Sequence, residues 1–404
     1  MRTLALVLLT AISLLAVEKR QIFPVGVKPV GPYSPGIMAG DYLYVSGQGA
    51  RDANGKFADS VEDRIRQAFK NVQAIVEAAG LTMEHIVYTQ VYLHESTAYQ
   101  TMDKVWKEVF PKNPPTRATL GVYRMPTETT FEVSAVAVRD LKMKVPVVPA
   151  SYPKDVALAP GILTPDRLFL SGFLGRDPKT GKVPETPEAQ VQLALDRMKE
   201  VLTEAKMDFR HMVFINPYLT KNMPMGVMNK VYAKHFEHGN TPARATIGVH
   251  FLPMGANIEF TGIAVRNLAD RKAVRPKNMP PSATASPCVF AAQTYYCSAK
   301  SGFIPGPNGG IYADNTVDQL RQTMRNLLDG LEEAGLKFSD VVASNVYVDN
   351  LDEFGAMNGV YGKYFPASMP PTRTTVAPLP PIERKKSESG QSPKLEEVSI
   401  VAVQ

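Results

Sequence analysis

The sequence predicts an α+β protein built from three tandem copies of one ββαβαββ unit. Two repeated features predict this organisation: an amphipathic helix occurs three times, and each time a Met-led segment and a loop with Pro and Arg follow it. The helix positions Val191 and Leu320 follow Ile65 by 126 and 255 residues, and Met228 and Met357 follow Met102 by the same offsets. Of the 404 residues, 44% are hydrophobic and 21% charged, which indicates folded globular domains rather than a disordered chain.

Two strands open each predicted unit, ending at the Ser-Gly pairs that begin with Ser46, Ser171 and Ser301. The first helix follows, with apolar residues spaced by three and four over residues 65–79, 191–205 and 320–334. Gly80 and Gly335 stand where a helix usually ends on a left-handed residue, and Lys206 takes that place in the second copy.

A strand rich in Val, Ile and Tyr comes next, and its three copies are Ile86–Leu93, Met212–Leu219 and Val341–Val348. The second helix, the Pro-Arg loop and a closing strand complete each unit. The closing strands are Phe131–Val138, Ile258–Val265 and Glu396–Val403. Helices on one face of a sheet give an α+β layer. A charged, Ser-rich insert at 383–394 in the third copy predicts an exposed flexible loop.

Composition changes place the units at residues 24–141, 149–268 and 282–404, with linkers at 142–148 and 268–286. Before them, Arg2, an apolar run at 4–16 and the small residue Ala16 are typical of a cleaved secretion signal, so we expect an exported protein, periplasmic or secreted. No later stretch is long and apolar enough to span a membrane. The alternatives for 1–16 are a membrane anchor and a start-site artefact.

The chain has two cysteines, Cys288 and Cys297, so it does not depend on a disulfide framework. A two-residue turn at 292–293 would set them opposite each other on a hairpin, which leaves a disulfide and two free thiols both open. Six scattered His and these two Cys show no metal-ligand spacing. The net charge of +6 is mildly basic, and a solvated surface explains it as well as nucleic-acid binding does.

An arginine recurs just after each proline-containing loop, as Arg117, Arg244 and Arg373. A guanidinium fits a carboxylate through two parallel hydrogen bonds, so we expect a small carboxylic acid as ligand, with an interdomain ion pair as the alternative. A glutamate recurs among apolar residues of the closing strand, as Glu132, Glu259 and Glu397. Such a carboxylate is costly to bury, which favours either a proton-transfer role or a solvent-facing strand position.

The ordered set of these motifs resembles the RidA/YjgF family, also called the endoribonuclease L-PSP or Rid family. In the first copy it consists of Gly31-Pro32-Tyr33-Ser34-Pro35, Tyr42 to Gln48, Pro115-Thr116-Arg117-Ala118-Thr119 and Phe131-Glu132-Val133. The resemblance recurs once per unit and implies a chorismate-mutase-like fold, assembled as a trimer with ligand pockets between neighbours. Three copies in one chain then imply an intramolecular pseudo-trimer that is monomeric and has internal pseudo-threefold symmetry.

The resemblance also implies an activity, the hydrolysis of reactive enamines and imines such as 2-aminoacrylate to a 2-keto acid and ammonia. The arginines would anchor the substrate carboxylate, the glutamates would assist attack by water, and no metal or organic cofactor is needed. The other substrate-binding residues that it implies are Tyr33, Ser46, Ser171, Ser301, Asn229 and Asn358.

The copies depart from the family pattern, so we expect three unequal pockets. The tyrosine at 33 is replaced by Leu158 in the second copy and by Ala285 or Cys288 in the third, and Asp103 stands where the other copies have asparagine. A non-catalytic binder of small carboxylates, or an interaction module, is therefore the alternative to a deaminase. An RNA-cleaving enzyme is the least favoured, because basic residues are not clustered with aromatic ones.

Overall fold

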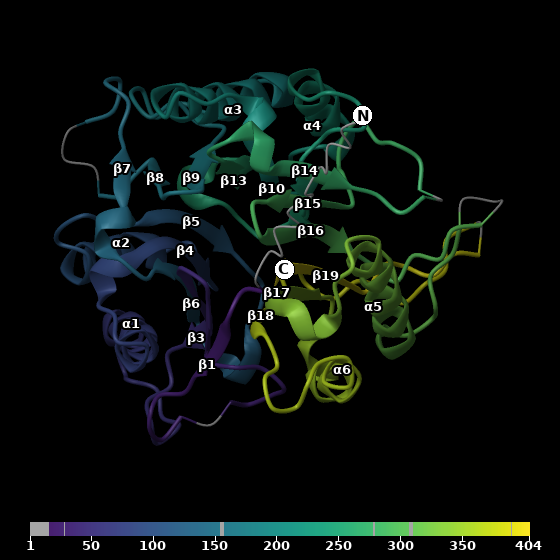
Figure 1. Cartoon of the computed structure of the whole chain (residues 1–404), viewed down its shortest axis with the longest axis horizontal. Helices are drawn as coiled ribbons and strands as arrows, with labels where there is room; N and C mark the ends of the chain where they lie inside the picture. The colour runs from purple at the N-terminus through teal and green to yellow at the C-terminus, as the bar shows by residue number, and fades with distance from the viewer. Residues whose placement is uncertain (1–15, 28, 154–156, 278, 307–309, 389) are drawn as a thin grey trace, which may run out of the picture.

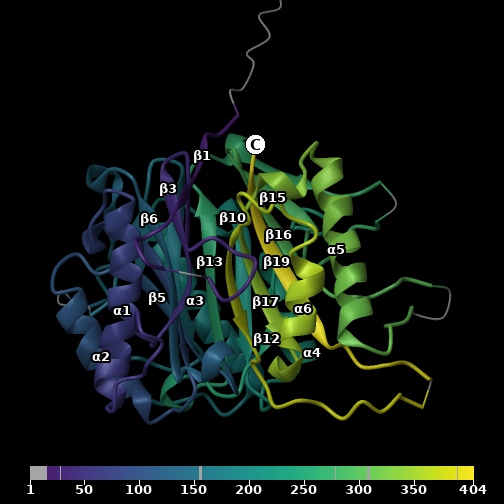
Figure 2. The same ribbon diagram turned by 90° about the horizontal axis from the view of Figure 1, so that it is seen from below.

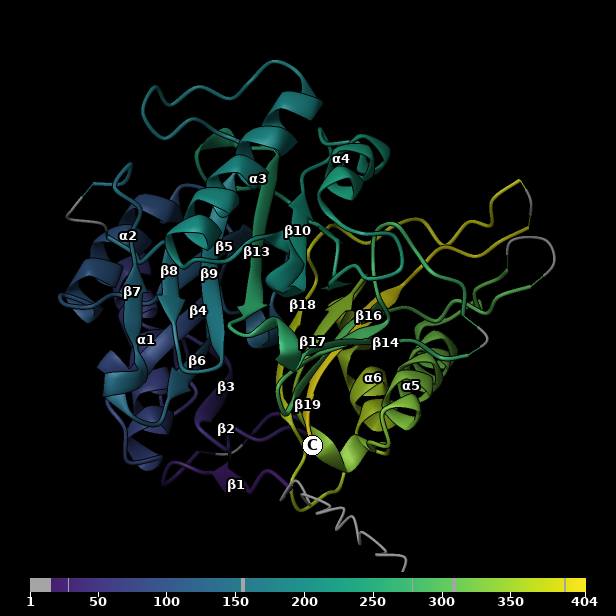
Figure 3. The same ribbon diagram turned by 45° about the horizontal axis from the view of Figure 1, so that its top comes forward.

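The computed structural model of the chain describes residues 16–27, 29–153, 157–277, 279–306, 310–388 and 390–404. It contains three mixed sheets, each with two main helices on its outer face (Figures 1 and 3). All but Ala16 of the predicted secretion signal lies outside the described residues. Among the helices of the described ranges, none is both long and apolar enough to cross a membrane.

The first unit forms a six-stranded sheet of order β1-β2-β3-β6-β4-β5. Its elements are β1 (Lys19–Ile22), β2 (Gly36–Ala39), β3 (Tyr42–Gly49), α1 (Val61–Ala78), β4 (Ile86–Leu93), α2 (Ala98–Val109), β5 (Thr116–Gly121) and β6 (Phe131–Val138). Strands β4 and β5 run parallel and the other neighbours antiparallel, which is the pattern of a mixed sheet.

The second and third units repeat this order. In the second they are β7 (Val145–Val147), β8 (Gly161–Leu163), β9 (Arg167–Leu174), α3 (Pro187–Glu204), β10 (Met212–Leu219), α4 (Met225–Tyr232), β11 (Ala243–Arg244), β12 (Ile247–Gly248) and β13 (Ile258–Val265). In the third they are β14 (Arg271–Val274), β15 (Cys288–Ala291), β16 (Thr294–Lys300), α5 (Thr316–Glu333), β17 (Val341–Val348), α6 (Phe354–Tyr361), β18 (Thr372–Val376) and β19 (Glu396–Val403).

The long helices begin and end at the predicted places. The side chains of Ser60, Thr186 and Asn315 each accept a hydrogen bond from a backbone N–H of the first turn, as N-cap residues do. After the helices, Gly80 has φ +80° and Lys206 has φ +60°. The long helix of the second unit, α3, therefore ends in the same left-handed geometry without a glycine.

Each unit has its own core between helices and sheet, and the inner faces of the three sheets share further cores. Apolar residues on one face of α1, α3 and α5 pack on the outer faces of their sheets. Tyr92, Tyr218 and Tyr347, one from each unit, belong to a single inner cluster. The inner faces thus bury one another, and the three units form a closed pseudo-trimer within one chain.

The same backbone contact closes the ring at each junction between units. Ser34 N donates to Pro371 O at 3.0 Å, Ala159 N to Pro115 O at 3.2 Å, and Ser286 N to Pro242 O at 3.0 Å. Val17 N also donates to Gln404 O at 2.9 Å, so the two described ends of the chain meet on one side of the molecule (Figure 2).

Two expectations need revision. The predicted unit starts at 24, 149 and 282 leave out β1, β7 and β14, which pair antiparallel with β2, β8 and β15. These edge strands are short and polar or proline-containing, so they carry no apolar alternation that would have revealed them. The 383–394 insert is exposed as expected but is tied down, since Arg384 pairs with Asp349 at 3.1 Å and Gln391 donates to Gly310 O at 2.8 Å.

The open question about the cysteines is answered by the hairpin of β15 and β16. Ala292 has φ +50° in the two-residue turn, Cys288 lies directly opposite Cys297, and a disulfide joins them.

Candidate functional site

Three equivalent seams arise where the arginine-bearing strand of one unit meets the opening strands of the next. Strand β5 lies against β9, β11 against β16, and β18 against β3. We call these junctions the 1/2 seam, the 2/3 seam and the 3/1 seam. Each brings an arginine of one unit within electrostatic range of a glutamate of the next. The pairs are Arg117 with Glu259, Arg244 with Glu397, and Arg373 with Glu132.

Every seam arginine lies over an aromatic ring of the second helix of its own unit. The guanidinium carbon is 4.6 Å from the Trp106 ring centre for Arg117, 5.2 Å from that of Tyr232 for Arg244, and 4.9 Å from that of Tyr361 for Arg373. These rings are fully buried core residues, as the sequence predicts, and they also fix the plane of the guanidinium.

At the 1/2 seam the arginine is already paired. Arg117 Nη2 donates to Asp103 Oδ1 at 2.9 Å, and the Arg117 side chain is 2% exposed. Ala159 and Ser34 make the equivalent backbone hydrogen bond at their seams, so the residues before them, Leu158 and Tyr33, occupy equivalent positions. The charge that would attract an incoming carboxylate is thus neutralised from within the chain.

At the 2/3 seam it is the glutamate that has a partner. Glu397 pairs with Lys394 at 2.7 Å, and Arg244 Nη1 donates to Asn229 Oδ1 at 2.7 Å. The seam hydrogen bond of Ser286 places Ala285 at the position of Tyr33, so Cys288 is excluded from that role. Burial lowers the pKa of Arg244.

The 3/1 seam keeps its arginine and its glutamate without such internal partners. Among the described residues, Arg373 Nη1 and Asn358 Oδ1 are buried and have no hydrogen-bond partner. Tyr33 lies with its ring centre 5.2 Å from the Arg373 guanidinium carbon. Gly31 has no side chain, which leaves space beside Arg373 and the Asn358 amide. An unmet buried donor on a cation is costly, so this seam is built to receive a polar ligand.

Two of the glutamates are buried so that they hold a proton at neutral pH. Burial raises the pKa of Glu132 to about 8, and the charge of Arg373 opposes that rise. Burial likewise raises the pKa of Glu259 to about 8, against the backbone N–H of Thr119 and the charge of Arg117. A carboxyl that titrates near the working pH can both give and take a proton.

Glycines of the opening strands decide where the glutamates point. A Cβ on Gly47 or Gly172 would collide with the carboxyl of Glu132 or Glu259. The strand register puts Ala299 at this position in the third unit, since Val45 and Cys297 occupy equivalent ladder positions. Its methyl group excludes the buried position of the carboxyl, which explains why Glu397 turns to Lys394.

The same register corrects one predicted residue. Ser46 N donates to Pro35 O, Ser171 N to Pro160 O and Ser298 N to Pro287 O, so Ser298 and not Ser301 is the third equivalent. Ser171 and Ser298 accept a hydrogen bond from the backbone N–H of Arg117 and Arg244, at 3.0 and 2.7 Å. Ser301 pairs with Tyr312 instead. The alignment was wrong because the Ser-Gly pair recurs three residues late in the third unit, past a β-bulge.

The family model described as Endoribonuclease L-PSP matches the chain three times, over residues 25–139, 154–266 and 277–381. The chain belongs to this family. A RutC family protein of Saccharolobus solfataricus is 36% identical over 112 residues, which is 27% of this chain and 89% of that protein. The 2-iminobutanoate/2-iminopropanoate deaminase of Dermatophagoides farinae is 31% identical over 117 residues, 28% of this chain and 91% of that protein.

Single-unit structures match one third of this L-PSP family chain at a time. The structure of Escherichia coli TdcF with bound serine is 31% identical and covers 30% of this chain and 99% of that chain, with a TM-score of 0.29.

Of the residues singled out from the sequence of this L-PSP family chain, the 3/1 seam gathers Tyr33, Ser46, Asn358, Arg373 and Glu132. The roles of Gly47 and Ala299 were not predicted from the sequence, although the Ser-Gly pair recurs there. Phe354, whose ring lies 5.4 Å from the Arg373 guanidinium carbon, was not predicted either.

Proposed function

We propose that the chain hydrolyses small carboxylate-bearing imines, and their enamine tautomers such as 2-aminoacrylate, to 2-keto acids and ammonia at the 3/1 seam. The observation that carries the proposal is a buried arginine with an unpaired Nη1 beside a buried carboxyl, Glu132, whose pKa burial raises to about 8. The similarity to a protein named 2-iminobutanoate/2-iminopropanoate deaminase supports the reaction class.

Arg373 is the group that would hold the substrate carboxylate. Its Nη1 has no partner among the described residues, and the rings of Tyr33, Phe354 and Tyr361 surround the guanidinium. These rings exclude water, so a charge-assisted hydrogen bond to a carboxylate is stronger there than at the surface. Asn358 Oδ1 is the free acceptor beside it and suits an N–H of the imine.

Glu132 is the proton-transfer group in this scheme. Its neutral carboxyl gives a proton to the imine nitrogen, and the resulting carboxylate takes a proton from the water whose oxygen bonds to the imine carbon. Glu132, neutral again, protonates the nitrogen of the carbinolamine. Ammonia then leaves, the carbon–oxygen double bond of the keto acid forms, and the hydroxyl proton returns to the Glu132 carboxylate. One imine and one water give one keto acid and one ammonia, so Glu132 returns to its starting state.

The protein needs to lower the activation barrier only modestly, because such imines also hydrolyse in water. Positioning the water and the carboxyl against a fixed substrate, together with proton transfer, is enough to accelerate the reaction. All the required groups are side chains of the chain itself, and no metal or organic cofactor enters the scheme.

The test measures keto-acid release from freshly generated 2-aminoacrylate by the full chain. We expect Arg373→Ala to lower the catalysed rate by about a hundredfold, the loss of two charge-assisted hydrogen bonds of roughly 1.5 kcal/mol each. Arg117→Ala and Arg244→Ala are the matched controls and should stay within about twofold of wild type. Arg373→Lys keeps the positive charge but cannot make two parallel hydrogen bonds to a carboxylate. Its catalysed rate should lie between those of wild type and Arg373→Ala.

A non-catalytic binder of small carboxylates is the second candidate. It is favoured by the 1/2 and 2/3 seams, where internal partners occupy Arg117 and Glu397. Wild type that releases keto acid only at the uncatalysed rate, yet binds 2-oxobutanoate in a manner that Arg373→Ala abolishes, would establish the binder and end the deaminase proposal.

We also infer that the chain is exported and acts as a monomer. Arg2, the apolar run at 4–16 and Ala16 support export, and the Cys288–Cys297 disulfide suits an oxidising compartment. Recovery of the full chain with Met1 intact from the cytoplasm would contradict export. Light scattering that gives the mass of several chains would contradict the monomer.

A further inference from the structure

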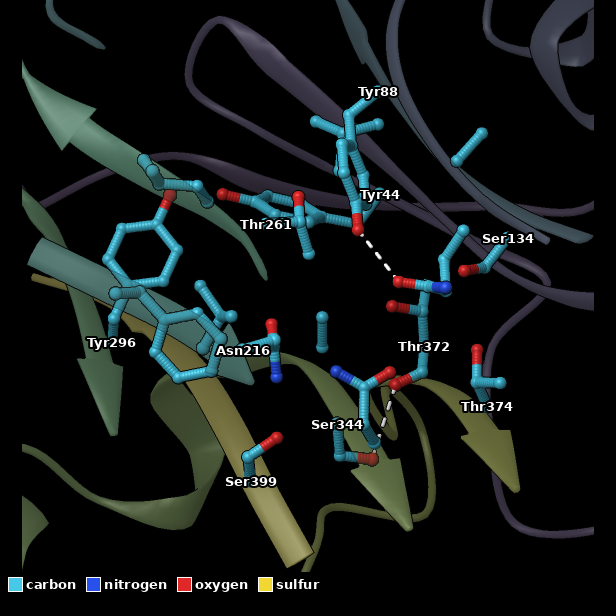
Figure 4. Close-up of a pocket in the computed structure, with 18 of the residues that line it drawn as sticks. Tyr44, Tyr88, Ser134, Asn216, Thr261, Tyr296, Ser344, Thr372, Thr374 and Ser399 are labelled. Atoms are coloured by element: carbon cyan, nitrogen blue, oxygen red, sulfur yellow. Dashed lines mark hydrogen bonds between the residues drawn. The ribbon is translucent and has the colours of Figure 1, made fainter. Parts of the chain in front are cut away.

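A cavity of 120 Å³ lies where the inner faces of the three sheets meet (Figure 4). Its wall takes equivalent residues from every unit, so it lies on the pseudo-threefold axis. The sets are Tyr44, Phe169 and Tyr296; Gln90, Asn216 and Asn345; Ser134, Thr261 and Ser399; and Tyr92, Tyr218 and Tyr347. We call it the central cavity.

Amide and hydroxyl groups face each other across the strands that line the central cavity. The strand ladder pairs Gln90 with Ser134, Asn216 with Thr261, and Asn345 with Ser399. In the first unit the Gln90 amide is used, because its Oε1 accepts from Tyr88 OH at 2.8 Å and from Tyr218 OH at 3.1 Å.

The third unit leaves its polar groups free. Among the described residues, the side chains of Asn345 and Ser399 have no hydrogen-bond partner, although both line the cavity. Asn216 Nδ2, by contrast, donates to Ala245 O at 3.2 Å, and Thr261 Oγ1 to Leu170 O at 2.7 Å. Unpaired polar groups inside a protein require water or a ligand.

The third unit also supplies the space. Ala343 stands at the ladder position that Tyr88 and Phe214 occupy in the other units. An aromatic ring is therefore missing from one side of the cavity, next to Asn345. The rings of Phe214 and Tyr296 also line the cavity, with centres 5.9 Å apart.

The lining carries no exposed ionised group. Arg373 contributes to the wall, but its guanidinium lies among the rings of Tyr33, Phe354 and Tyr361, none of which lines the cavity. Burial raises the pKa of Tyr92, Tyr218 and Tyr347, so these hydroxyls stay neutral. A charged molecule would lose its hydration there without gaining a counter-charge.

We propose that the central cavity, which shares Ser46 and Arg373 with the wall of the 3/1 seam, is a second binding site for a small uncharged ring compound with one hydrogen-bonding group. The ring would take the place of the aromatic side chain missing at Ala343, and the polar group would meet Asn345 and Ser399. A cavity of about 150 Å³ holds benzene in a protein interior, so the available space suits a single ring. This site does not depend on the proposed seam chemistry.

Phenol is the probe for the full-length protein. We expect saturable binding by NMR titration, with phenol rather than waters alone in the cavity of a soaked crystal. Ala343→Phe copies the residue of the second unit and fills the space, so it should weaken phenol binding at least tenfold. Arg266→Ala is the control, because it changes an exposed residue that does not line the cavity and should leave phenol binding unchanged.

Asn345→Leu keeps the branched shape of the side chain and removes the amide, and it is the second test if Ala343→Phe does not fold. It should weaken phenol about fivefold, the effect of one hydrogen bond, while benzene binding is kept. No saturable binding of phenol by wild type, equal affinity in Ala343→Phe, or crystals with waters alone in the cavity would each overturn the proposal.

Discussion

Asp103 accepts a 2.9 Å hydrogen bond from the guanidinium of Arg117 at the position where the other two units have an asparagine. Asn229 accepts the corresponding bond from Arg244 at 2.7 Å, so the asparagine side chain fits the same geometry without the charge. At the 1/2 seam the carboxylate of Asp103 thus occupies the guanidinium of Arg117, which would otherwise bind the carboxylate of a ligand.

Removing that carboxylate should open the 1/2 seam to ligands. Asp103→Asn keeps the hydrogen bond but frees the positive charge of Arg117, and a charge-assisted hydrogen bond contributes about 1.5–3 kcal/mol. We expect at least tenfold tighter binding of 2-oxobutanoate at this seam, seen in calorimetry as a second binding site. Asp59→Asn removes an exposed acidic group and should change nothing; a site count that stays the same in Asp103→Asn would refute the explanation.

A methyl group at residue 47 should disable the 3/1 seam. Gly47→Ala places a Cβ on the carboxyl of Glu132, as Ala299 does opposite Glu397 in the third unit. We expect the catalysed release of keto acid to fall by about a hundredfold, since Glu132 must leave its place beside Arg373 and general acid–base catalysis contributes roughly 10²–10⁴.

Gly172→Ala makes the same change at the 1/2 seam and is the control for strand stability. It should keep the wild-type rate, because Arg117 is already paired there. Equal losses in both variants would mean that the methyl group harms the fold and not the site.

The repeats made the helices, the long strands and the Arg–Glu pairs predictable, because apolar spacing and recurring motifs report buried faces directly. The short edge strands β1, β7 and β14 were not predictable, since their residues are polar or include proline. Ser298 was missed because a dipeptide motif does not reveal a β-bulge. Which seam keeps a free arginine depends on side-chain partners such as Lys394, which lies inside the insert. No spacing rule could have predicted that.

The pseudo-threefold axis shows what fusion into one chain permits. Tyr42, Arg167 and Thr294 occupy equivalent ladder positions, and they meet in one buried network. Arg167 Nη1 donates to Tyr296 OH at 2.6 Å, and Nη2 donates to Thr294 Oγ1 at 2.8 Å and pairs with Asp166 at 2.5 Å. In a homotrimer this position would bring three copies of one residue together, and three buried guanidiniums would repel one another.

Arg167→Met should therefore destabilise the whole chain. The variant leaves Asp166, whose side chain is 28% exposed, without its cation beside buried tyrosines, so the cost should lie at the lower end of the about 3–5 kcal/mol for breaking a buried ion pair. We expect the free energy of unfolding in urea to fall by that amount. Arg266→Met, at an exposed position, should change it by less than about 0.5 kcal/mol. A small loss for Arg167→Met would show that the axis is not held by this network.

The stability of the protein should fall as pH rises above about 5, owing to buried carboxyls. Glu396 is 2% exposed and occupies the strand position that Phe131 and Ile258 have in the other units. It accepts hydrogen bonds from the Thr323 hydroxyl and from the backbone N–H of Gly302. Burial raises the pKa of Glu396 to about 8, against an ordinary value of 4.5. The folded state therefore keeps a proton that the unfolded state has lost.

The contribution of Glu396 is fully present below pH 4.5 and is lost as pH rises through 8, at on the order of 1 kcal/mol per pH unit. Glu132 and Glu259, whose pKa values are also about 8, act in the same direction. Unfolding at pH 5 and pH 8.5 should show a lower free energy of unfolding at pH 8.5 for wild type and a smaller difference for Glu396→Gln, which keeps an acceptor for Thr323 but does not titrate. Glu333→Gln, at an exposed position, should retain the wild-type difference. If Glu396→Gln retains it too, the carboxyl of Glu396 is ionised in the folded protein, and its burial is compensated by Thr323 and Gly302 alone.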